Sequence, residues 1–404
     1  MKGQKKKHIL VVSQYFYPEQ FRINDICTEW VKRGYKVTVL TGIPNYPQGT
    51  FYEGYDLKHK RYEEWNGVKI IRIPLTERKS GSVRLAMNYM SFVASGFVWK
   101  TMTNIKADFV FIFEVSPMTQ ALNGVWYAKK HKIPCYLYVQ DLWPENVESV
   151  TGIHSPAVIE PIRKMTDYIY KNCDHIFATS PSFVKEIQKR CSGEEVKVTY
   201  WPQYAEEFYQ PVEKTDVPEI PDDDSFKVVF TGNIGQAQGL EILPKAATLL
   251  KEENVKFIII GDGRNKDDFI RQVKENNAES QFILIDRQPA ERIPAMLTCC
   301  DVAFLSFMDN ELFEKTIPAK LQSYMACAMP IIASANGETK RVIEEAQCGI
   351  CCELGNVAAL AGGIRALMSR TDLKQMGSNA RNYSNSHFEK TELMDEMDQY
   401  FEGE

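Results

Sequence analysis

The sequence lacks several features that would assign it to common classes of protein. It has only six histidines, and no Cys-x-x-Cys pair is matched by a histidine pair, so a zinc site is not indicated. The apolar run nearest the first residue, Ile9–Val12, is too short for a secretory signal peptide. The ten cysteines lie mostly inside apolar runs, which is typical of reduced core thiols. We therefore expect a cytoplasmic protein with neither disulfides nor a bound metal.

Strong net charge is also lacking, but the charge is unevenly spread. The chain carries a net charge of −5, whereas residues 1–104 contain 17 lysines and arginines against 8 acidic residues. A basic region of this kind is most often a solvated face. It also favours contact with an anionic membrane or an anionic acceptor. We expect no nucleic-acid partner.

What the sequence does contain is an alternation of short apolar runs and amphipathic stretches. Many runs are apolar on successive residues, as in parallel strands that helices cover on both faces. Because the alternation falls into two blocks, the sequence predicts an α/β protein with two doubly wound, Rossmann-like domains facing a cleft. The expected strands are 9–12, 37–41, 68–73, 109–113, 135–139 and 176–179, then 228–231, 257–260, 282–285, 302–306, 331–333 and 350–352.

The boundary between the blocks is predicted from composition. Residues 205–225 contain Pro211, Pro218 and Pro221 and little apolar periodicity, so they are interpreted as a linker. The N-terminal domain is then 1–204 and the C-terminal domain 226–385. A charged helical segment, 386–404, could pack back on the N-terminal domain.

A glycine-rich turn follows the first strand of the second block. Gly232, Gly235 and Gly239 let the backbone turn sharply and approach a ligand, and a helix is expected to follow them. The N–H groups at a helix start favour a phosphate. The spacing matches neither the dinucleotide fingerprint nor a P-loop. A glycine turn without a ligand is the alternative.

Cations follow two other strands of this block. Arg264 comes after Gly261-Asp-Gly263 and could reach a phosphate or a nucleobase, although a surface arginine at a turn is the commoner case. Lys315 and Lys320, with Thr316, flank a helix start near Pro318. Two cations there oppose the helix dipole, and a bound anion would remove the conflict.

Polar residues also follow strands of the first block. Arg22 is a candidate anion contact, and Asn24 is a candidate either for the site or for a helix N-cap. Asp141 and Glu145 would point into the cleft, unless they are a capping Asp and an exposed Glu. Two further residues occupy similar positions after a strand, Glu114 and Ser116.

Taken together, these residues resemble the family-4 glycosyltransferases, the retaining group with the GT-B fold. Within that family the chain is similar to bacterial enzymes of cell-surface polysaccharide assembly, of the L-fucosamine transferase type. The matching pieces span nearly the whole chain in order: Tyr17-Pro-Glu19, Thr41–Gly49, Asp141-Leu-Trp-Pro-Glu145, Gly232–Gly235 with Gln238–Leu240, Gly261-Asp-Gly263, and Thr316–Ala326.

The resemblance implies a nucleotide-sugar donor, most simply UDP-linked, held by the C-terminal domain, and an acceptor held by the N-terminal domain. It implies retention of configuration without a metal, with positive groups stabilising the departing diphosphate. The donor residues would be Gly232, Asn233, Gly235, Gln238, Gly239, Arg264, Arg287, Lys315, Thr316, Lys320 and Ser323. The acceptor or cleft residues would be Arg22, Asn24, Asn45, Ser116 and Glu145, and the candidate catalytic residues are Glu114, Asp141 and Lys320.

The sequence departs from the family pattern at several of these positions. Asn233 and Gln238 stand where many members have Arg and Lys, and Lys315 and Ser323 stand where many have a pair of Glu. The His often found after the fourth strand is absent, and Glu114 is nearby. We expect Lys315 and Lys320 to supply the missing charge.

One segment bears on the membrane. Residues 85–99 carry no charge and are flanked by Arg84 and Lys100, but the run is too short to span a bilayer. It is either a buried helix or an interfacial helix with basic residues, Arg78 and Lys79 included, near lipid headgroups.

The leading hypothesis is transfer of an N-acetylated hexosamine-type sugar to a lipid-linked glycan, by a protein peripheral on the inner face of the membrane. A nucleotide-sugar 2-epimerase of the same architecture and a non-catalytic partner protein are the alternatives.

Overall fold

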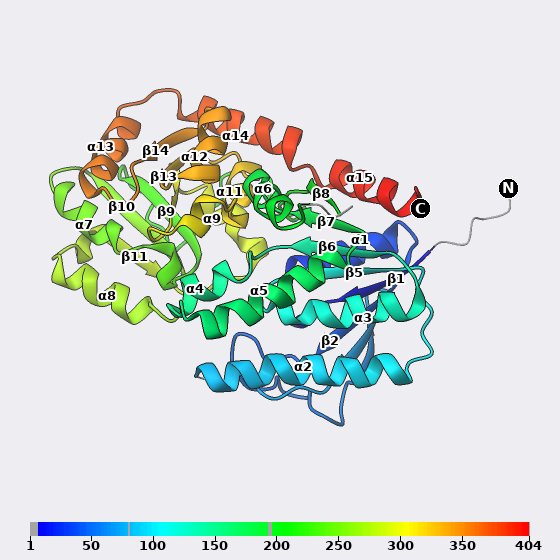
Figure 1. The fold of residues 1–404 in the computed structure, drawn as a ribbon. Helices are drawn as coiled ribbons and strands as arrows, with labels where there is room; N and C mark the ends of the chain where they lie inside the picture. Colours follow the sequence, from blue (N-terminus) through cyan, green and yellow to red (C-terminus); the bar gives the residue numbers. More distant parts are fainter. Residues whose placement is uncertain (1–6, 80, 193–195, 404) are drawn as a thin grey trace, which may run out of the picture. The chain divides into compact units, whose positions relative to one another are not determined.

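The computed structural model describes residues 7–79, 81–192 and 196–403, which form two compact units, Met1–Tyr200 and Trp201–Glu404. Each unit is built on one mainly parallel sheet with helices between successive strands (Figure 1). The predicted class, two doubly wound α/β domains, is confirmed. The ten cysteines are all free thiols.

The first unit contains an eight-stranded sheet in the order β3-β4-β2-β1-β5-β6-β7-β8 among the residues described. Its elements are β1 (His8–Val12), α1 (Arg22–Lys32), β2 (Lys36–Gly42), β3 (Tyr62–Trp65), β4 (Val68–Ile73), α2 (Ser82–Met102), β5 (Phe109–Glu114), η1 (Met118–Gln120), α3 (Ala121–His131), β6 (Cys135–Val139), α4 (Glu145–Thr151), α5 (Pro156–Lys171), β7 (His175–Ala178), α6 (Pro181–Arg190) and β8 (Lys197–Tyr200).

The second unit contains a six-stranded parallel sheet in the order β11-β10-β9-β12-β13-β14 within the described ranges. Its elements are β9 (Phe226–Asn233), η2 (Gln236–Gln238), α7 (Ile242–Leu249), β10 (Val255–Asp262), α8 (Lys266–Glu275), η3 (Glu279–Gln281), β11 (Phe282–Ile285), η4 (Ala290–Arg292), α9 (Ile293–Leu297), β12 (Val302–Ser306), α10 (Glu311–Glu314), α11 (Ala319–Ala326), β13 (Ile331–Ser334), α12 (Gly337–Glu345), β14 (Gly349–Cys352), α13 (Val357–Met368), α14 (Leu373–His387) and α15 (Lys390–Glu402).

The central strands are where the sequence prediction is most accurate. β1, β5 and β6 are buried along their whole length, because helices cover both faces of the sheet, and their sequences are correspondingly apolar on successive residues. The prediction missed β3 and β8. β3 is an antiparallel edge strand with the polar sequence Tyr-Glu-Glu-Trp, and β8 is only partly buried, so neither has a continuous apolar run.

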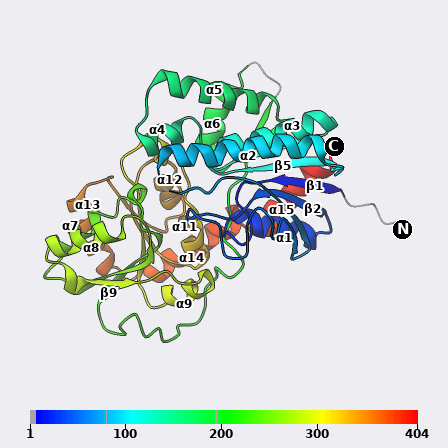
Figure 2. The ribbon, with the colours of Figure 1, turned by 90° about the horizontal axis from the view of Figure 1, so that it is seen from below.

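Helix α2 is a surface helix of the first unit and packs beside α3 (Figures 1 and 2). Only Asn88, Phe92, Val93 and Gly96 of its 21 residues are buried. Of the two alternatives left open by the sequence, the structure excludes a buried helix, because most of its apolar side chains face outward. Within the described parts of the chain, no helix is long and apolar enough to cross a membrane.

The segment that follows β8 packs within the second unit. The indole N–H of Trp201 donates to the carbonyl of Leu393 on α15 at 2.9 Å, and Lys390 forms an ion pair with Glu207 at 2.8 Å. Val217 and Ile220 of the linker are buried. The C-terminal helical stretch consists of two helices, since α14 ends at His387 and α15 begins at Lys390.

Candidate active site

Each sheet has a topological switch point, where the chain connections from two adjacent central strands run in opposite directions along the sheet. It lies between β1 and β5 in the first unit and between β9 and β12 in the second. Ligands of open α/β sheets bind beyond the carboxyl ends of the strands at such points. Most of the candidate residues follow β1, β5, β6, β9, β10 or β11 or lie on α11, so they gather at the carboxyl ends of the two sheets.

The glycine turn after β9 packs against α11 and against the segment after β12. Gly232 has a φ of +124°, and a Cβ there would lie 2.8 Å from Cε of Lys320. Gly239 has a φ of +55°, and a Cβ would lie 2.8 Å from the carbonyl oxygen of Phe307. Ser306 Oγ donates to the carbonyl of Gln238 at 2.5 Å. These glycines are thus required by close packing, which also fixes the turn at the switch point.

Lys320 is the cation that this packing holds at the turn. Its Nζ lies 4.3 Å from the centroid of the Phe230 ring, on β9 itself. Burial lowers the pKa of Lys320 to about 7, and no carboxylate among the described residues forms an ion pair with it. A lysine in this position gains a full charge when an anion binds beside it. Lys320 is therefore the candidate anion contact at this turn.

The helix predicted after the glycine turn is α7. The short helix η2 and Gly239 separate Gly235 from α7, which begins at Ile242. The N-terminus of α7 is therefore not the first group that an anion at Gly232 would meet. The side chain of Asn233 lies over Gly235 instead, where an added Cβ would be 2.6 Å from Nδ2.

The turn after β10 is joined to the glycine turn through the backbone. The N–H of Ile234 donates to the carbonyl of Asp262 at 2.8 Å, and a Cβ on Gly261 would lie only 1.9 Å from the carbonyl oxygen of Gly232. Arg264 follows this turn and Arg287 follows β11, the next strand of the sheet. Both guanidinium groups are exposed, so both could reach a ligand at this edge.

The other predicted donor residues have local roles. Lys315 is the C-cap of α10, where a cation is favourable, so the predicted conflict between two cations and one helix start reduces to Lys320 alone. Thr316 Oγ1 donates to the carbonyl of Leu312 at 2.9 Å, and Ser323 Oγ donates to that of Ala319 at 3.1 Å. Each hydroxyl therefore already has a hydrogen-bond partner, the backbone carbonyl four residues earlier in the chain.

Two carboxyl groups meet at the edge of the first sheet. Glu114 ends β5 and is fully buried, and its Oε2 accepts the N–H of Asp141, after β6, at 3.4 Å. Glu114 Oε1 has no hydrogen-bond partner among the described residues. Burial, together with the charge of Asp141, raises the pKa of Glu114 well above its usual range, and burial also raises the pKa of Asp141. Burial thus disfavours the charged form of Glu114.

Ser116 orients Asp141. The backbone N–H of Ser116 donates to Asp141 Oδ2 at 2.7 Å, and its hydroxyl accepts the indole N–H of Trp143 at 3.0 Å. Asp141 is not a helix cap, because Pro144 occupies that position of α4. Glu145 lies in the first turn of α4 and is 3.9 Å from the guanidinium of Arg190, which favours a structural role.

Of the candidate residues that follow β1 and β2, two asparagines make local hydrogen bonds and only an arginine acts on a group at this edge. Arg22 is the first residue of α1, and its charge acts on the Tyr138 hydroxyl at the end of β6, which places it near this edge. Asn24 is not an N-cap, since α1 begins before it, and its Nδ2 donates to the carbonyl of Glu19 at 2.7 Å. Asn45 is fully buried, and its Nδ2 donates to the carbonyl of Ile43.

Glu19, the last residue of the Tyr17-Pro-Glu19 motif, organises this edge. Its buried carboxylate accepts the backbone N–H groups of Tyr46, Asn45 and Phe16, at 2.7, 2.8 and 3.3 Å. Burial raises the pKa of Glu19 to about 7. Glu19 thereby ties the loop after β1 to the loop after β2.

An aromatic cluster at the same edge was not predicted. The rings of Tyr15, Phe21 and Tyr46 pack together, and the Arg78 guanidinium lies 4.9 Å from the centroid of the Tyr46 ring. Burial raises the pKa of Tyr89, and the charge of Asp141 adds to this rise, which places the tyrosine near Asp141. Arg78, which the interfacial alternative places near lipid headgroups, packs against the Tyr46 ring. The aromatic loop was visible in the sequence, but its arginine comes from beyond β4.

The comparisons with known proteins concern the family and the fold of the chain. Residues 212–383 match the family model described as "Glycosyl transferases group 1". The chain is 27% identical over 249 residues to "Probable glycosyltransferase WbjE" of Pseudomonas aeruginosa, a match covering 60% of this chain and 61%, less than two thirds, of that protein. It is 25% identical over 410 residues to "Putative colanic acid biosynthesis glycosyl transferase WcaI" of Escherichia coli strain K12, covering 96% of this chain and 97% of the relative.

The chain is a glycosyltransferase with a group 1 domain. Its fold is similar to that of HepE from Anabaena, which was solved in complex with UDP. That likeness has a TM-score of 0.69 at 14% identity and covers 99% of this chain and 100% of HepE. The matched family segment contains the glycine turn, Arg264 and Lys320.

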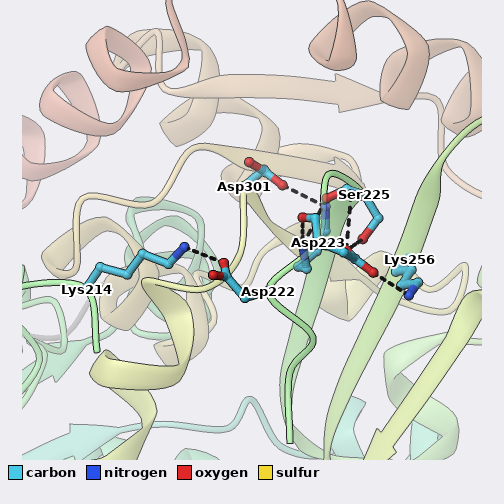
Figure 3. Close-up of polar contacts among 7 residues, drawn as sticks. Lys214, Asp222, Asp223, Ser225, Lys256 and Asp301 are labelled. Atoms are coloured by element: carbon cyan, nitrogen blue, oxygen red, sulfur yellow. Dashed lines mark hydrogen bonds and ion pairs between the residues drawn. The ribbon is translucent and has the colours of Figure 1, made fainter. Parts of the chain in front are cut away.

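The glycosyltransferase also has an open pocket of about 510 Å³ away from these residues, at the start of β9 rather than its end. Asp223 binds both Lys227 and Lys256 there, and Lys214 binds Asp222 at 2.9 Å (Figure 3). Because lysines already neutralise Asp222 and Asp223, we interpret the pocket as the junction between the linker and the sheet. In the described ranges, no three His, Cys, Asp or Glu side chains are grouped to hold a metal ion.

Proposed function

We propose that this glycosyltransferase transfers an N-acetylated hexosamine-type sugar from a UDP-linked donor to a lipid-linked glycan, with retention of configuration. The second unit would hold the donor and the first unit the acceptor. The name of the WcaI relative refers to colanic acid biosynthesis, and that of HepE's structure refers to bound UDP. Both names support a role in surface polysaccharide assembly from a nucleotide sugar.

The observation that carries the proposal is the half-buried ammonium of Lys320 against the glycine turn. A diphosphate placed over Gly232 would restore the charge that burial removes from Lys320. During transfer, the same ammonium would stabilise the negative charge that develops on the leaving UDP. Arg264 and Arg287 would act further along the edge, toward the base. With this cation in place, we propose transfer without a metal, so that excess EDTA leaves the rate unchanged.

On the acceptor side, Asp141 is the residue that we assign to the reacting hydroxyl. Its carboxylate is oriented by the N–H of Ser116 and could accept a hydrogen bond from the acceptor. The raised pKa of Glu114 limits the negative charge beside Asp141. The Tyr46 ring, with Arg78 against it, offers an apolar face for a sugar ring.

Isothermal titration calorimetry with UDP and UDP-N-acetylglucosamine tests the donor site. Lys320→Ala should weaken UDP binding by roughly 10- to 100-fold, as expected for loss of a charged hydrogen-bond partner. Lys374→Ala is the matched control, because Lys374 is an exposed lysine at the start of α14 in the same unit. Unchanged UDP affinity in Lys320→Ala would show that the diphosphate has been misplaced.

Product analysis separates the proposal from its two alternatives. Incubation of the UDP-sugar with a membrane extract should give a labelled lipid-linked glycan with the donor's anomeric configuration. Conversion of the UDP-sugar alone into its 2-epimer would identify an epimerase. Failure to bind any UDP or GDP compound in a thermal-shift screen would favour a non-catalytic partner protein.

A further inference from the structure

The outward face of α2 is the largest unexplained apolar feature of the first unit. The exposed residues of this helix are apolar except for Ser82, Arg84 and Thr101: Val83, Ala86, Met87, Met90, Ala94, Phe97, Val98 and Met102. Met90, Phe97, Val98 and Met102 are 57%, 49%, 54% and 75% exposed. Their spacing returns to the same side of the helix every three or four residues. A continuous apolar stripe therefore runs along the whole helix, and we call it the α2 stripe.

The surroundings of the α2 stripe are positively charged. Neither α2 nor the adjacent α3 contains an acidic residue, and together they carry Arg84, Lys100, Lys129 and Lys130. Lys100 lies with its Nζ 4.2 Å from the centroid of the Phe97 ring. Burial and the charge of Lys130 lower the pKa of Lys100, which shows that these ammonium groups are crowded. A negatively charged surface would relieve this repulsion.

Aromatic residues lie beside the C-terminal part of the α2 stripe. Phe97 packs edge-on against Trp126 of α3, with ring centroids 5.6 Å apart, and Lys100 also lies over the Trp126 ring at 5.4 Å. An aromatic pair beside lysines at the margin of an apolar strip is the arrangement of helices that lie in the headgroup region of a bilayer.

We propose that the α2 stripe docks the first unit on an anionic lipid bilayer, with α2 lying in the plane of the interface. The apolar side chains would enter the boundary between headgroups and acyl chains, while Arg84, Lys100 and Lys130 contact lipid phosphates. No helix among the residues described could span the bilayer, so the contact is peripheral. The inference rests on the α2 stripe and its cations, independently of the donor and acceptor assigned above.

Vesicle flotation with the full chain tests the docking. The probes are phosphatidylcholine vesicles, with and without one third phosphatidylglycerol, at low and high salt. The wild-type protein should bind the anionic vesicles, and high salt should weaken this binding. The double variant Met90→Glu/Phe97→Glu should bind at least about tenfold less strongly, because charged side chains oppose interfacial insertion. Arg84→Glu/Lys130→Glu should lose the preference for anionic lipid.

A matched double variant distinguishes insertion from a general effect of added charge. Leu57→Glu/Tyr62→Glu replaces two exposed apolar residues elsewhere in the first unit, 55% and 77% exposed, and should bind vesicles like the wild type. Met90 and Phe97 on α2 and the two control residues are all exposed, so the thermal unfolding temperature of both double variants should be unchanged. UDP affinity measured without vesicles should also be unchanged, which separates failure of docking from failure of the donor assignment.

Three results would overturn the proposal. The first is equal binding of the wild type to neutral and anionic vesicles. The second is anionic binding that Met90→Glu/Phe97→Glu leaves intact. The third is sedimentation showing that the wild type self-associates, that this variant is monomeric, and that neither binds vesicles; the stripe would then be a contact between two copies of the chain.

Discussion

The carboxyl edges of the two sheets solve the same electrostatic problem with opposite charges. The first unit buries Glu19, Glu114 and Asp141, whose pKa values burial raises. The second unit holds Lys320, whose pKa burial lowers to about 7. Both edges therefore carry less charge than their sequences suggest. A carboxyl group with a raised pKa suits proton exchange with an acceptor hydroxyl, and a lysine that is easily recharged suits a diphosphate.

The largest expected effect comes from removing the ionisable group at the acceptor edge. Asp141→Asn should reduce turnover by about 10²- to 10⁴-fold, the range for loss of a residue that handles a proton. UDP affinity should stay within about twofold, because Asp141 belongs to the first unit. Steady-state kinetics combined with calorimetry checks both. A variant that lost UDP binding but kept its turnover number would contradict the division of roles.

The next effect concerns stability and the buried carboxylate of Glu19. Its pKa is raised to about 7, so its contribution to stability is fully present below the unfolded pKa and is lost as the pH rises through 7. The loss should not exceed about 3 kcal/mol. Urea unfolding at pH values from 5 to 8 should show a decline for the wild type, and the decline should be smaller in Glu19→Gln. Equal slopes in the two proteins would show that Glu19 is ionised throughout.

The smallest expected effect is the pH dependence of donor binding. Free Lys320 loses its proton above a pH of about 7, whereas a bound diphosphate keeps it charged. UDP affinity should therefore fall with rising pH above 7, by at most about tenfold per pH unit, and binding should take up a proton. Calorimetry in buffers of different ionisation enthalpy measures this uptake. Lys320→Arg should show none, since arginine stays charged.

Secondary structure was predicted most accurately where burial on both faces produces a continuous apolar run in the sequence. Strands such as β1 and β5 are apolar on every residue because both of their faces are covered. The edge strand β3 left no such trace, since its polar residues face solvent on a sheet margin. The helical character of residues 85–99 was evident from composition. Its orientation was not, because Asn88 is buried while Phe97 is exposed, the reverse of what their polarities suggest.

The candidate site shows the same division. Residue types and their places after strands were enough to single out Gly232, Lys320, Glu114 and Asp141. Their roles depended on neighbours that are distant in the sequence. Gly232 is a glycine because the Lys320 side chain packs against it, and Lys315 turned out to cap α10. No spacing rule gives such contacts.

By itself, then, the sequence determined the two-unit α/β architecture and the edges at which chemistry can occur, because strand burial and strand order are written in local apolar patterns. Only the tertiary structure decided the charge states at those edges. Burial of Glu114 and Lys320 depends on side chains brought together from separate strands and helices, and desolvation by those neighbours sets their pKa values. It also decided that α2 presents its apolar side chains outward.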